Sequence, residues 1–360
     1  MLNNNYQARW WKKLKEGSVQ CYLCPRLCLI LENKRGFCFV RQNIGGELIL
    51  TTYGRSSGFC IDPIEKKPLY HFYPGTSVLS FGTAGCNMGC KFCQNWNISR
   101  SKEFDCLSER ATPMMIAETA KKVGVKSVAF TYNDPVIFAE YAIDTAKECR
   151  LKGIKTIAVT AGYISNEARK EFFESMDAAN VDLKSINESF YKRLVLAELK
   201  PVLDTLIFIK EKTNVWLEIT NLIIPGENDS DDDLKNICNW IVENLGREVP
   251  IHFSAFHPNF QMMNYNPTPK QTLLKARQIA LQKGMQHVYT GNIEDDEGST
   301  TYCSTCHQNV IERSRYEIKQ YHLINNKCDS CHASCAGFFD QKPGAWGSRC
   351  VSVKLGEESS

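Results

Sequence analysis

Three cysteines within one short segment have the spacing of an iron–sulfur site. Cys86, Cys90 and Cys93 follow the strand-like run SVLSFGTAG as C-x3-C-x2-C. A four-iron cubane takes four ligands, so three protein thiolates leave one iron open to bind a small molecule. Phe92, beside the third thiol, would shield such a cluster. The spacing predicts a [4Fe–4S] cluster with an open iron, against the alternatives of chance clustering and a zinc site with a distant fourth ligand.

Two further cysteine groups each offer four thiols. The C-terminal group has the spacing C-x2-C-x21-C-x2-C of a zinc ribbon, in which four thiolates hold one tetrahedral metal. A rubredoxin-like iron fits the same ligands, and Cys335 or Cys350 could replace one of them. The N-terminal group, C-x2-C-x3-C-x9-C, suits zinc or an auxiliary cluster, and we favour a structural role. The candidate ligands are Cys303, Cys306, Cys328 and Cys331 (Zn or Fe) and Cys21, Cys24, Cys28 and Cys38 (Zn or auxiliary cluster).

Composition narrows the class of protein. Seventeen cysteines among 360 residues, mostly clustered and without a secretion signal, indicate metal binding rather than disulfides. The net charge of +3 gives no support for a nucleic-acid partner, and no apolar run is long enough for a membrane span. We therefore expect a cytoplasmic protein with no nucleic acid and no membrane. The cysteines that stand alone are expected to be small buried hydrophobes: Cys60, Cys106, Cys149 and Cys238.

The elements that must position the cysteine loop alternate between strand-like and helix-like segments. Helix starts are expected at Thr112-Pro113, at Ser230 and at Thr268-Pro269. Repeated β–α units imply parallel strands with the site at their carboxyl ends. The pattern predicts an α/β fold, a partial (β/α)6-type barrel, with a doubly wound sheet as the alternative. The predicted strands are Ser77–Thr83, Ser127–Tyr132, Thr156–Thr160, Ala179–Lys184, Val215–Ile224, Ile251–Phe256 and His287–Asn292.

The cysteine groups also divide the chain. Residues 1–70 are expected to form a Cys-rich, metal-binding N-terminal extension and residues 71–298 the barrel. Residues 299–360 would form a zinc-ribbon-like element and a tail.

Several segments resemble a known family. The C-x3-C-x2-C spacing with an aromatic residue before the third cysteine resembles the signature of radical S-adenosylmethionine (radical SAM) enzymes. Longer strings resemble the branch related to pyruvate formate-lyase (glycyl-radical) activating enzymes, and within it the radical enzyme of the AmmeMemoRadiSam system. The resemblance covers roughly residues 20–340, in the strings CYLCPRLC, DPIEKKPLYHFYPG, GTAGCNMGCKFCQNWNISR, TYNDP, DAANVDLK, NLIIPGENDSDDDL, FHP, VYTGNI and TYCSTC.

The resemblance implies an oxidoreductase that reductively cleaves S-adenosylmethionine at a [4Fe–4S] cluster. The 5′-deoxyadenosyl radical so formed would abstract hydrogen from an unknown small molecule or partner protein. Implied partners are Memo-like and Amme-like proteins and an electron donor such as flavodoxin or ferredoxin. One alternative is a glycyl-radical enzyme activase. An alternative of another class is a non-catalytic zinc-binding scaffold, which metal and sulfide analysis after anaerobic purification would distinguish.

The resemblance also implies contacts to S-adenosylmethionine. Asn133 and Asp134 lie in TYNDP, which resembles a GGEP-type motif that grips the methionyl amine; Tyr and Asn replace its glycines, and a simple helix cap is the alternative. Asp182 and Lys184 share one strand face and match a DLK motif of activating enzymes, with an internal salt bridge as the alternative.

Three other residues are weaker candidates for the cofactor site. Thr160 follows the third predicted strand, in VTAGY. His252 resembles a cofactor-contacting histidine, although a structural role is as common, and His257 competes for that role. Glu65, Lys66, Lys67 and His71 could touch substrate or a partner protein, but a solvated surface is the commoner explanation for the charged run at residues 65–67.

Overall fold

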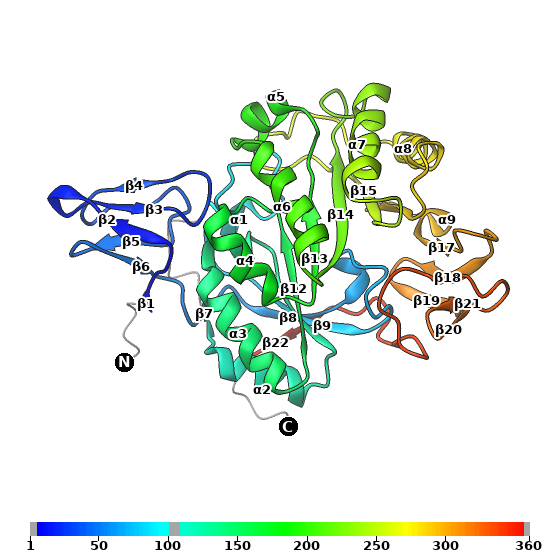
Figure 1. Cartoon of the computed structure of the whole chain (residues 1–360), viewed down its shortest axis with the longest axis horizontal. Coiled ribbons are helices and arrows are strands. Elements are labelled where there is room, and N and C mark those ends of the chain that lie inside the picture. Colours follow the sequence, from blue (N-terminus) through cyan, green and yellow to red (C-terminus); the bar gives the residue numbers. More distant parts are fainter. Residues whose placement is uncertain (1–5, 101–108, 356–360) are drawn as a thin grey trace.

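One large sheet organises the protein. The computed structural model describes residues 6–100 and 109–355, and its main sheet has the strand order β16-β15-β14-β13-β12-β11-β9-β8-β22 (Figure 1). The strands from β9 to β16 are parallel, whereas β8 and β22 run antiparallel to their neighbours. The parallel strands are β9 (Ser77–Phe81), β11 (Ser127–Phe130), β12 (Lys155–Thr160), β13 (Ala178–Asp182), β14 (Trp216–Ile223), β15 (Ile251–Ala255) and β16 (Val288–Gly291). All seven predicted strands are confirmed, and the partial barrel with them.

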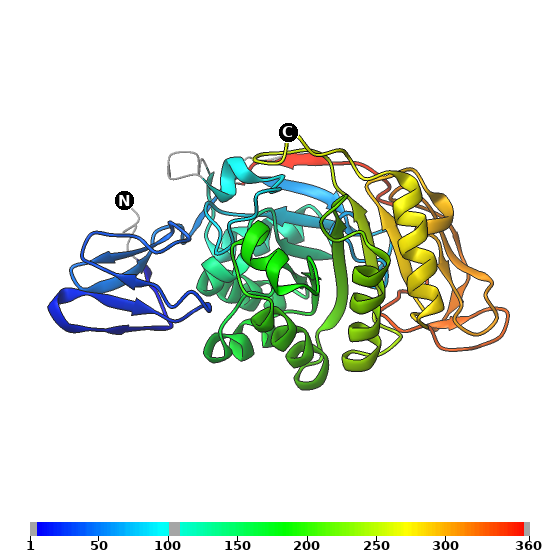
Figure 2. The same cartoon turned by 90° about the horizontal axis from the view of Figure 1, so that it is seen from above.

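Helices separate the parallel strands and cover the outer face of the curved sheet (Figure 2). The strands are largely buried, and all four residues of β11 are buried; the polar residues that the strands carry, such as Glu218 and His252, are buried as well. The helix α2 shows the matching pattern, since it buries Ile116, Ala117 and Ala120 on one side. The helices are α2 (Pro113–Lys122), α3 (Ala139–Leu151), α4 (Asn166–Glu174), α6 (Lys200–Lys212), α7 (Asp231–Asn244) and α8 (Lys270–Gln282).

Two of the three predicted helix starts are confirmed. The Thr112 hydroxyl accepts the Met115 N–H at 3.3 Å, and the Ser230 hydroxyl accepts the Asp233 N–H at 3.1 Å. The prediction at Thr268 is wrong, because α8 begins at Lys270. The buried Thr268 hydroxyl instead accepts the backbone N–H of residue 256, just after β15, and donates to the carbonyl of residue 223, so it joins the ends of β14 and β15.

The N-terminal unit contains two small antiparallel sheets. One joins β1 (Tyr6–Gln7), β6 (Glu47–Leu50) and β5 (Arg41–Ile44), and the other joins β2 (Trp11–Lys13), β3 (Val19–Cys21) and β4 (Leu29–Ile30). A buried ion pair at 2.5 Å between Arg41 and Glu140 of α3 holds the unit against the barrel. Such a pair, buried on both sides, fixes the orientation of the two parts.

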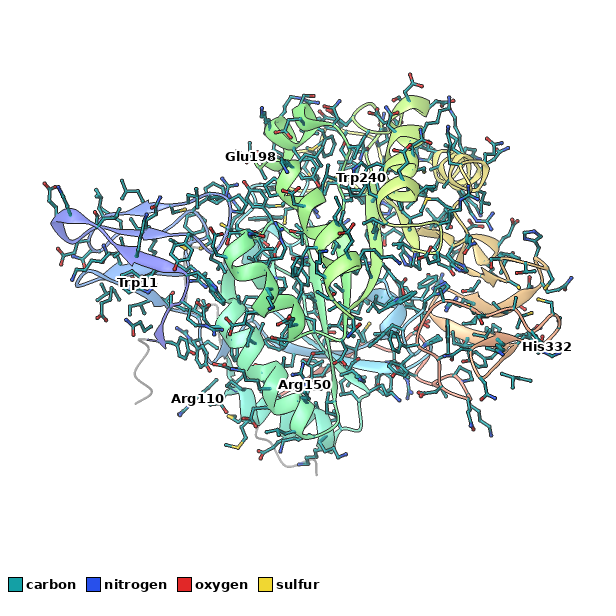
Figure 3. The ribbon with its side chains drawn as sticks, in the orientation of Figure 1. Trp11, Arg110, Arg150, Glu198, Trp240 and His332 are labelled. Atoms are coloured by element: carbon teal, nitrogen blue, oxygen red, sulfur yellow. The ribbon has the colours of Figure 1, made fainter. Side chains whose placement is uncertain are left out.

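The C-terminal unit is a second small β structure at the opposite end of the molecule. It contains β17 (Thr301–Tyr302), β18 (Asn309–Ser314) and β19 (Glu317–Tyr321), with the hairpin β20 (Leu323–Ile324) and β21 (Lys327–Cys328). Trp11 and His332 mark the two units in Figure 3.

The main sheet also takes strands from outside residues 71–298. They are β8 (Phe59–Pro63) and β22 (Val351–Val353), which pair with one another. The division of the chain at residues 70 and 298 stays a prediction. Within the described residues, no helix combines the length and apolar character that crossing a membrane requires.

The lone cysteines differ in their surroundings. Cys149 and Cys238 are fully buried, as predicted. The prediction is wrong for Cys60, which is half-buried with its thiol 3.4 Å from the carboxylate of Asp62. Cys106 lies outside the described residues.

Candidate active site

The loop that carries Cys86, Cys90 and Cys93 follows β9 at the carboxyl edge of the sheet. Its conformation requires glycine at position 85, where φ is +81° and an added Cβ would lie 2.0 Å from the carbonyl oxygen of Cys38. The loop is thus pressed against the N-terminal unit on one side.

Asn133, which follows β11, holds the other side of this loop. Its side-chain oxygen accepts the Thr83 N–H at 3.0 Å. Its amide donates to the Thr83 hydroxyl at 3.1 Å and to the carbonyls of Ala84 and Gly85 at 3.3 and 2.9 Å. Four hydrogen bonds from one buried amide make Asn133 a positioning residue for the cysteine loop.

The three thiols line a cavity of about 530 Å³ at the mouth of the barrel. Burial raises the pKa of Cys86, and it raises that of Cys90 to about 12, so a metal must displace the protons on binding. The described residues bring two groups of three or more potential ligand atoms within 4.8 Å of one another, and neither includes these thiols. Three thiols that face a cavity with this open spacing fit a multi-iron cluster better than a single tetrahedral ion.

Asp134 and Thr160 lie in the same cavity, but their polar atoms already have partners. The Asp134 carboxylate accepts the Val136 N–H at 3.0 Å, the Thr160 hydroxyl at 2.9 Å and the Ala161 N–H at 3.0 Å. Burial nevertheless raises the pKa of Asp134. The carboxylate caps the 3-10 helix η4 (Pro135–Phe138) and ties the ends of β11 and β12 together.

Asp182 and Lys184 form an ion pair at 2.9 Å on the cavity wall. Burial alone would lower the pKa of Lys184, but the neighbouring Asp182 carboxylate, with Cys90 beside it, outweighs burial and raises that pKa. The ammonium stays charged 5.8 Å from the centre of the Phe92 ring. A fixed cation beside Cys90 would offset negative charge on a bound cluster.

His252 lies apart from the thiols. Its Nε2 is 2.7 Å from Glu218 of β14, and this buried carboxylate also accepts the N–H groups of Tyr70 and His71. His252 lines a second cavity of about 630 Å³. His257 is exposed and is among the lining residues of neither cavity.

The two cavities adjoin. They share four lining residues that sequence reasoning did not assign to the site, namely Lys66, Ser254, Asn292 and Tyr316. Only Lys66 carried a signal, as part of the charged run. Two of the three residues of that run are not solvated, because Glu65 and Lys67 are 1% and 3% exposed and Lys67 pairs with Asp62 at 2.5 Å, whereas Lys66 is exposed.

The C-terminal cysteines are gathered as tightly as a single metal requires. The sulfurs of Cys303 and Cys331 lie 3.5 Å apart, and those of Cys306 and Cys328 lie 3.7 Å apart. Four thiolates at tetrahedral zinc lie about 3.8 Å apart. Cys335 takes no part in this set of four.

The remaining cysteines fall into two other arrangements. Cys335 lies with His71 and His287, with one ligand atom of each within 4.8 Å of the others. Neither compact group in the described residues includes a cysteine of the N-terminal set, Cys21, Cys24, Cys28 and Cys38.

Comparison with known proteins gives a consistent result. The profile of the Radical SAM superfamily matches residues 81–241, which include the cysteine loop. An uncharacterized protein of Methanocaldococcus jannaschii is 41% identical over 327 residues, covering 90% of this chain and 97% of that protein. The pyruvate formate-lyase-activating enzyme of Clostridium pasteurianum is 25% identical over 187 residues, covering 51% of this chain and 76% of that enzyme.

More distant similarities involve part of the chain. The GTP 3′,8-cyclase of Aquifex aeolicus is 29% identical over 173 residues, covering 46% of this chain and 52% of that enzyme. A crystallised domain of the pyruvate-formate lyase-activating enzyme from Bacteroides vulgatus is 19% identical with a TM-score of 0.41, covering 46% of this chain and 99% of that domain. With the matched profile and the three-thiol loop at the barrel mouth, this chain belongs to the radical SAM superfamily, whose enzymes use a [4Fe–4S] cluster and S-adenosylmethionine.

Proposed function

We propose that Cys86, Cys90 and Cys93 bind the [4Fe–4S] cluster and that S-adenosylmethionine occupies the adjacent cavity of about 530 Å³. The observation that carries this proposal is the position of three free thiols, with open spacing, on the wall of a cavity at the carboxyl ends of the strands. When bound, the cluster supplies the electron that splits a C–S bond of the cofactor and yields the 5′-deoxyadenosyl radical.

The chain itself positions the cofactor. Asn133 fixes the cysteine loop, and Asp134 and Thr160 fix the neighbouring strand ends through the hydrogen bonds described above. The Asp182–Lys184 pair offers both charges to a zwitterionic methionyl group. Because Asp134 is occupied by three donors, Asp182 is the freer acceptor for the methionyl amine.

The substrate would occupy the adjoining cavity of about 630 Å³, which has the volume for a small polar molecule or a short segment of a partner protein. His252, Ser254 and Tyr316 lie on its wall and could orient a polar substrate. Similarity to pyruvate formate-lyase-activating enzymes favours, as the second candidate, an activase that abstracts hydrogen from a partner's glycine.

The finer assignment rests on the sequence strings. They support a radical enzyme of the AmmeMemoRadiSam system with Memo-like and Amme-like partners. In the C-terminal set of four cysteines, the short distances between the sulfur atoms support a bound zinc ion.

The test is product formation by anaerobically reconstituted protein. With dithionite and S-adenosylmethionine, we expect 5′-deoxyadenosine by mass spectrometry. Deuterated candidate substrates, and partner proteins with deuterated glycine, should then transfer deuterium into 5′-deoxyadenosine. A protein that binds only zinc and forms no 5′-deoxyadenosine would contradict the proposal.

A further inference from the structure

The N-terminal cysteine unit lies directly behind the cysteine loop of the active site. The backbones of Cys38 and Gly85 are in contact, since a Cβ at position 85 would lie 2.0 Å from the Cys38 carbonyl oxygen. Arg26, between Cys24 and Cys28, donates to the carbonyl of Asn87. The residues immediately before and after Cys86, Gly85 and Asn87, therefore both contact the N-terminal unit.

The distances between the N-terminal thiols differ from those between the four thiols of the C-terminal unit, Cys303, Cys306, Cys328 and Cys331, here called the ribbon. The four ribbon sulfurs all lie within 4.8 Å of one another, whereas no compact group in the described residues includes an N-terminal cysteine. The same holds for the loop thiols, in a superfamily that uses a [4Fe–4S] cluster. Thiols around a cubane are held farther apart than thiols around one ion, because the edges of the cubane separate the irons. The open spacing favours a second cluster over zinc.

The two ends of the N-terminal cysteine set face different surroundings. Cys21 and Cys38 are buried, whereas Cys24 and Cys28 are half-buried. Around the half-buried pair, Leu27, Leu29 and Leu31 are 51%, 63% and 58% exposed. Leu29 is the exposed residue of β4, next to the buried Ile30, and Leu27 and Leu31 lie two residues before and after it in sequence. Three exposed leucines within five residues, here called the leucine patch, are typical of a site of protein contact.

Charge identifies the kind of partner. Residues 6–50, which form the N-terminal unit, contain eight Lys or Arg and three Asp or Glu, a formal charge of +5, in a chain whose net charge is only +3; of the eight, Arg41 is buried against Glu140. A strongly basic unit steers acidic proteins toward it and gives their binding a salt dependence. The patch of leucines within this basic unit fits an acidic partner with an apolar contact surface.

We propose that Cys21, Cys24, Cys28 and Cys38 bind a second iron–sulfur cluster and that the surrounding leucine patch docks an acidic one-electron carrier protein. One electron leaves the carrier, enters the N-terminal cluster and passes across the Cys38–Gly85 contact to the cluster of the active site, where cleavage of S-adenosylmethionine consumes it. No bond to the protein forms or breaks. The inference rests on the proposed function, because it supplies the electron that this function requires.

Metal analysis tests the occupant of the N-terminal site. The variant with Cys86, Cys90 and Cys93 all changed to Ala should retain about four irons and four sulfides per chain. Cys24→Ser/Cys28→Ser should lose that amount and still cleave S-adenosylmethionine with dithionite. If the first variant does not fold, Mössbauer quantification of the wild type decides between about eight irons and about four. A triple variant without iron and with a second zinc, or a wild type with four irons, would overturn the inference.

Kinetics test the docking surface, with flavodoxin as the acidic carrier. Leu27→Glu/Leu29→Glu should lower the flavodoxin-driven rate of cleavage about tenfold or more and leave the dithionite-driven rate within about twofold. The control Leu151→Glu, at a leucine 81% exposed on α3, should change neither rate. Equal rates in the two Leu→Glu proteins would overturn the docking surface. If wild type fails to react even with dithionite, it is the proposed function that fails instead.

Discussion

The C-terminal ribbon and the loop after β9 both present cysteine thiols, but they arrange these thiols differently. In the ribbon, four thiols contact one another beside a small core that includes Val310, Ile311 and Leu323. In the loop, three thiols stand apart on the wall of a cavity. A complete set of four ligands leaves no open coordination position and stabilises a fold, whereas three leave a position for chemistry. The number and spacing of the thiols therefore support the proposed division between a structural metal site in the C-terminal unit and a reactive cluster at the loop.

The largest expected effect comes from removing one thiol of the loop. Cys90→Ala should lower 5′-deoxyadenosine formation at least about 10³-fold, because groups that act as a unit fail together. Zinc content should stay at the wild-type value. The control is Cys149→Ala, which removes a buried cysteine of α3 outside the cavity and should leave the rate within about twofold. Similar rates in both variants would mean that the loop holds no reactive cluster.

Removing a thiol of the ribbon should lower zinc content and stability but leave the cleavage of S-adenosylmethionine in place, the opposite of the effect expected for Cys90→Ala. Cys328→Ala should abolish zinc binding and lower the Tm by about 10 °C or more, because the ribbon's core is too small to fold without its metal. Cleavage of S-adenosylmethionine should persist below the new Tm. Calorimetry with metal analysis measures the first effect; a variant with full stability and no zinc would refute a structural role.

A third variant tests the positioning of the loop. Asn133→Ala removes the side chain that makes four hydrogen bonds to residues 83–85, and should lower kcat about 10- to 100-fold. The KM for S-adenosylmethionine should change less, and the EPR spectrum of the reduced cluster should broaden. Asn180→Ala, at a buried asparagine of β13 outside the cavity lining, serves as control. A rise in KM alone would instead make Asn133 a direct contact of the cofactor.

The smallest effect concerns the contact between the ribbon and the barrel. His71 donates from Nδ1 to the carbonyl of Ala336 at 2.7 Å, and its neutral ring accepts the Tyr289 hydroxyl at Nε2 at 2.6 Å; burial lowers the pKa of His71 from 6.5 to about 4. As pH falls from 7 to 4, the unfolded chain takes up this proton first, so the folded state loses about 3 kcal/mol of unfolding free energy at this group.

Urea unfolding at a series of pH values measures that loss. The fall in stability between pH 6.5 and 4 should be smaller in His71→Gln than in wild type by this amount. The variant His257→Gln, at an exposed histidine, should follow wild type. Parallel curves for all three proteins would show that His71 is not held neutral by burial.

Local patterns in the sequence predicted much of this molecule. The seven strands follow from apolar runs, and the Thr112 and Ser230 caps from residue type. The prediction of a cap at Thr268 failed because its hydroxyl bonds the ends of β14 and β15, which lie 45 and 12 residues away in sequence. The same limit applies to Tyr316, which reaches the cavity only because the ribbon docks beside the barrel.

Side-chain partners set a second limit at the candidate site. TYNDP was read as a cofactor motif, and the structure places both Asn133 and Asp134 at the cavity. No periodicity or spacing could indicate that their polar atoms are occupied by the cysteine loop and by the end of β12. The ion pair of Asp182 and Lys184 was predictable, because residues two apart in an extended segment lie on the same face.

The most direct test of the central claim is whether S-adenosylmethionine binds the cluster of the three-thiol loop. Electron–nuclear double resonance on the reduced wild-type enzyme, with ¹⁵N in the methionyl amine and ¹⁷O in its carboxylate, reports contact between these atoms and iron. We predict coupling from both labels, and its loss in Cys90→Ala. A wild-type cluster with no coupling to either label would contradict an open iron at Cys86, Cys90 and Cys93.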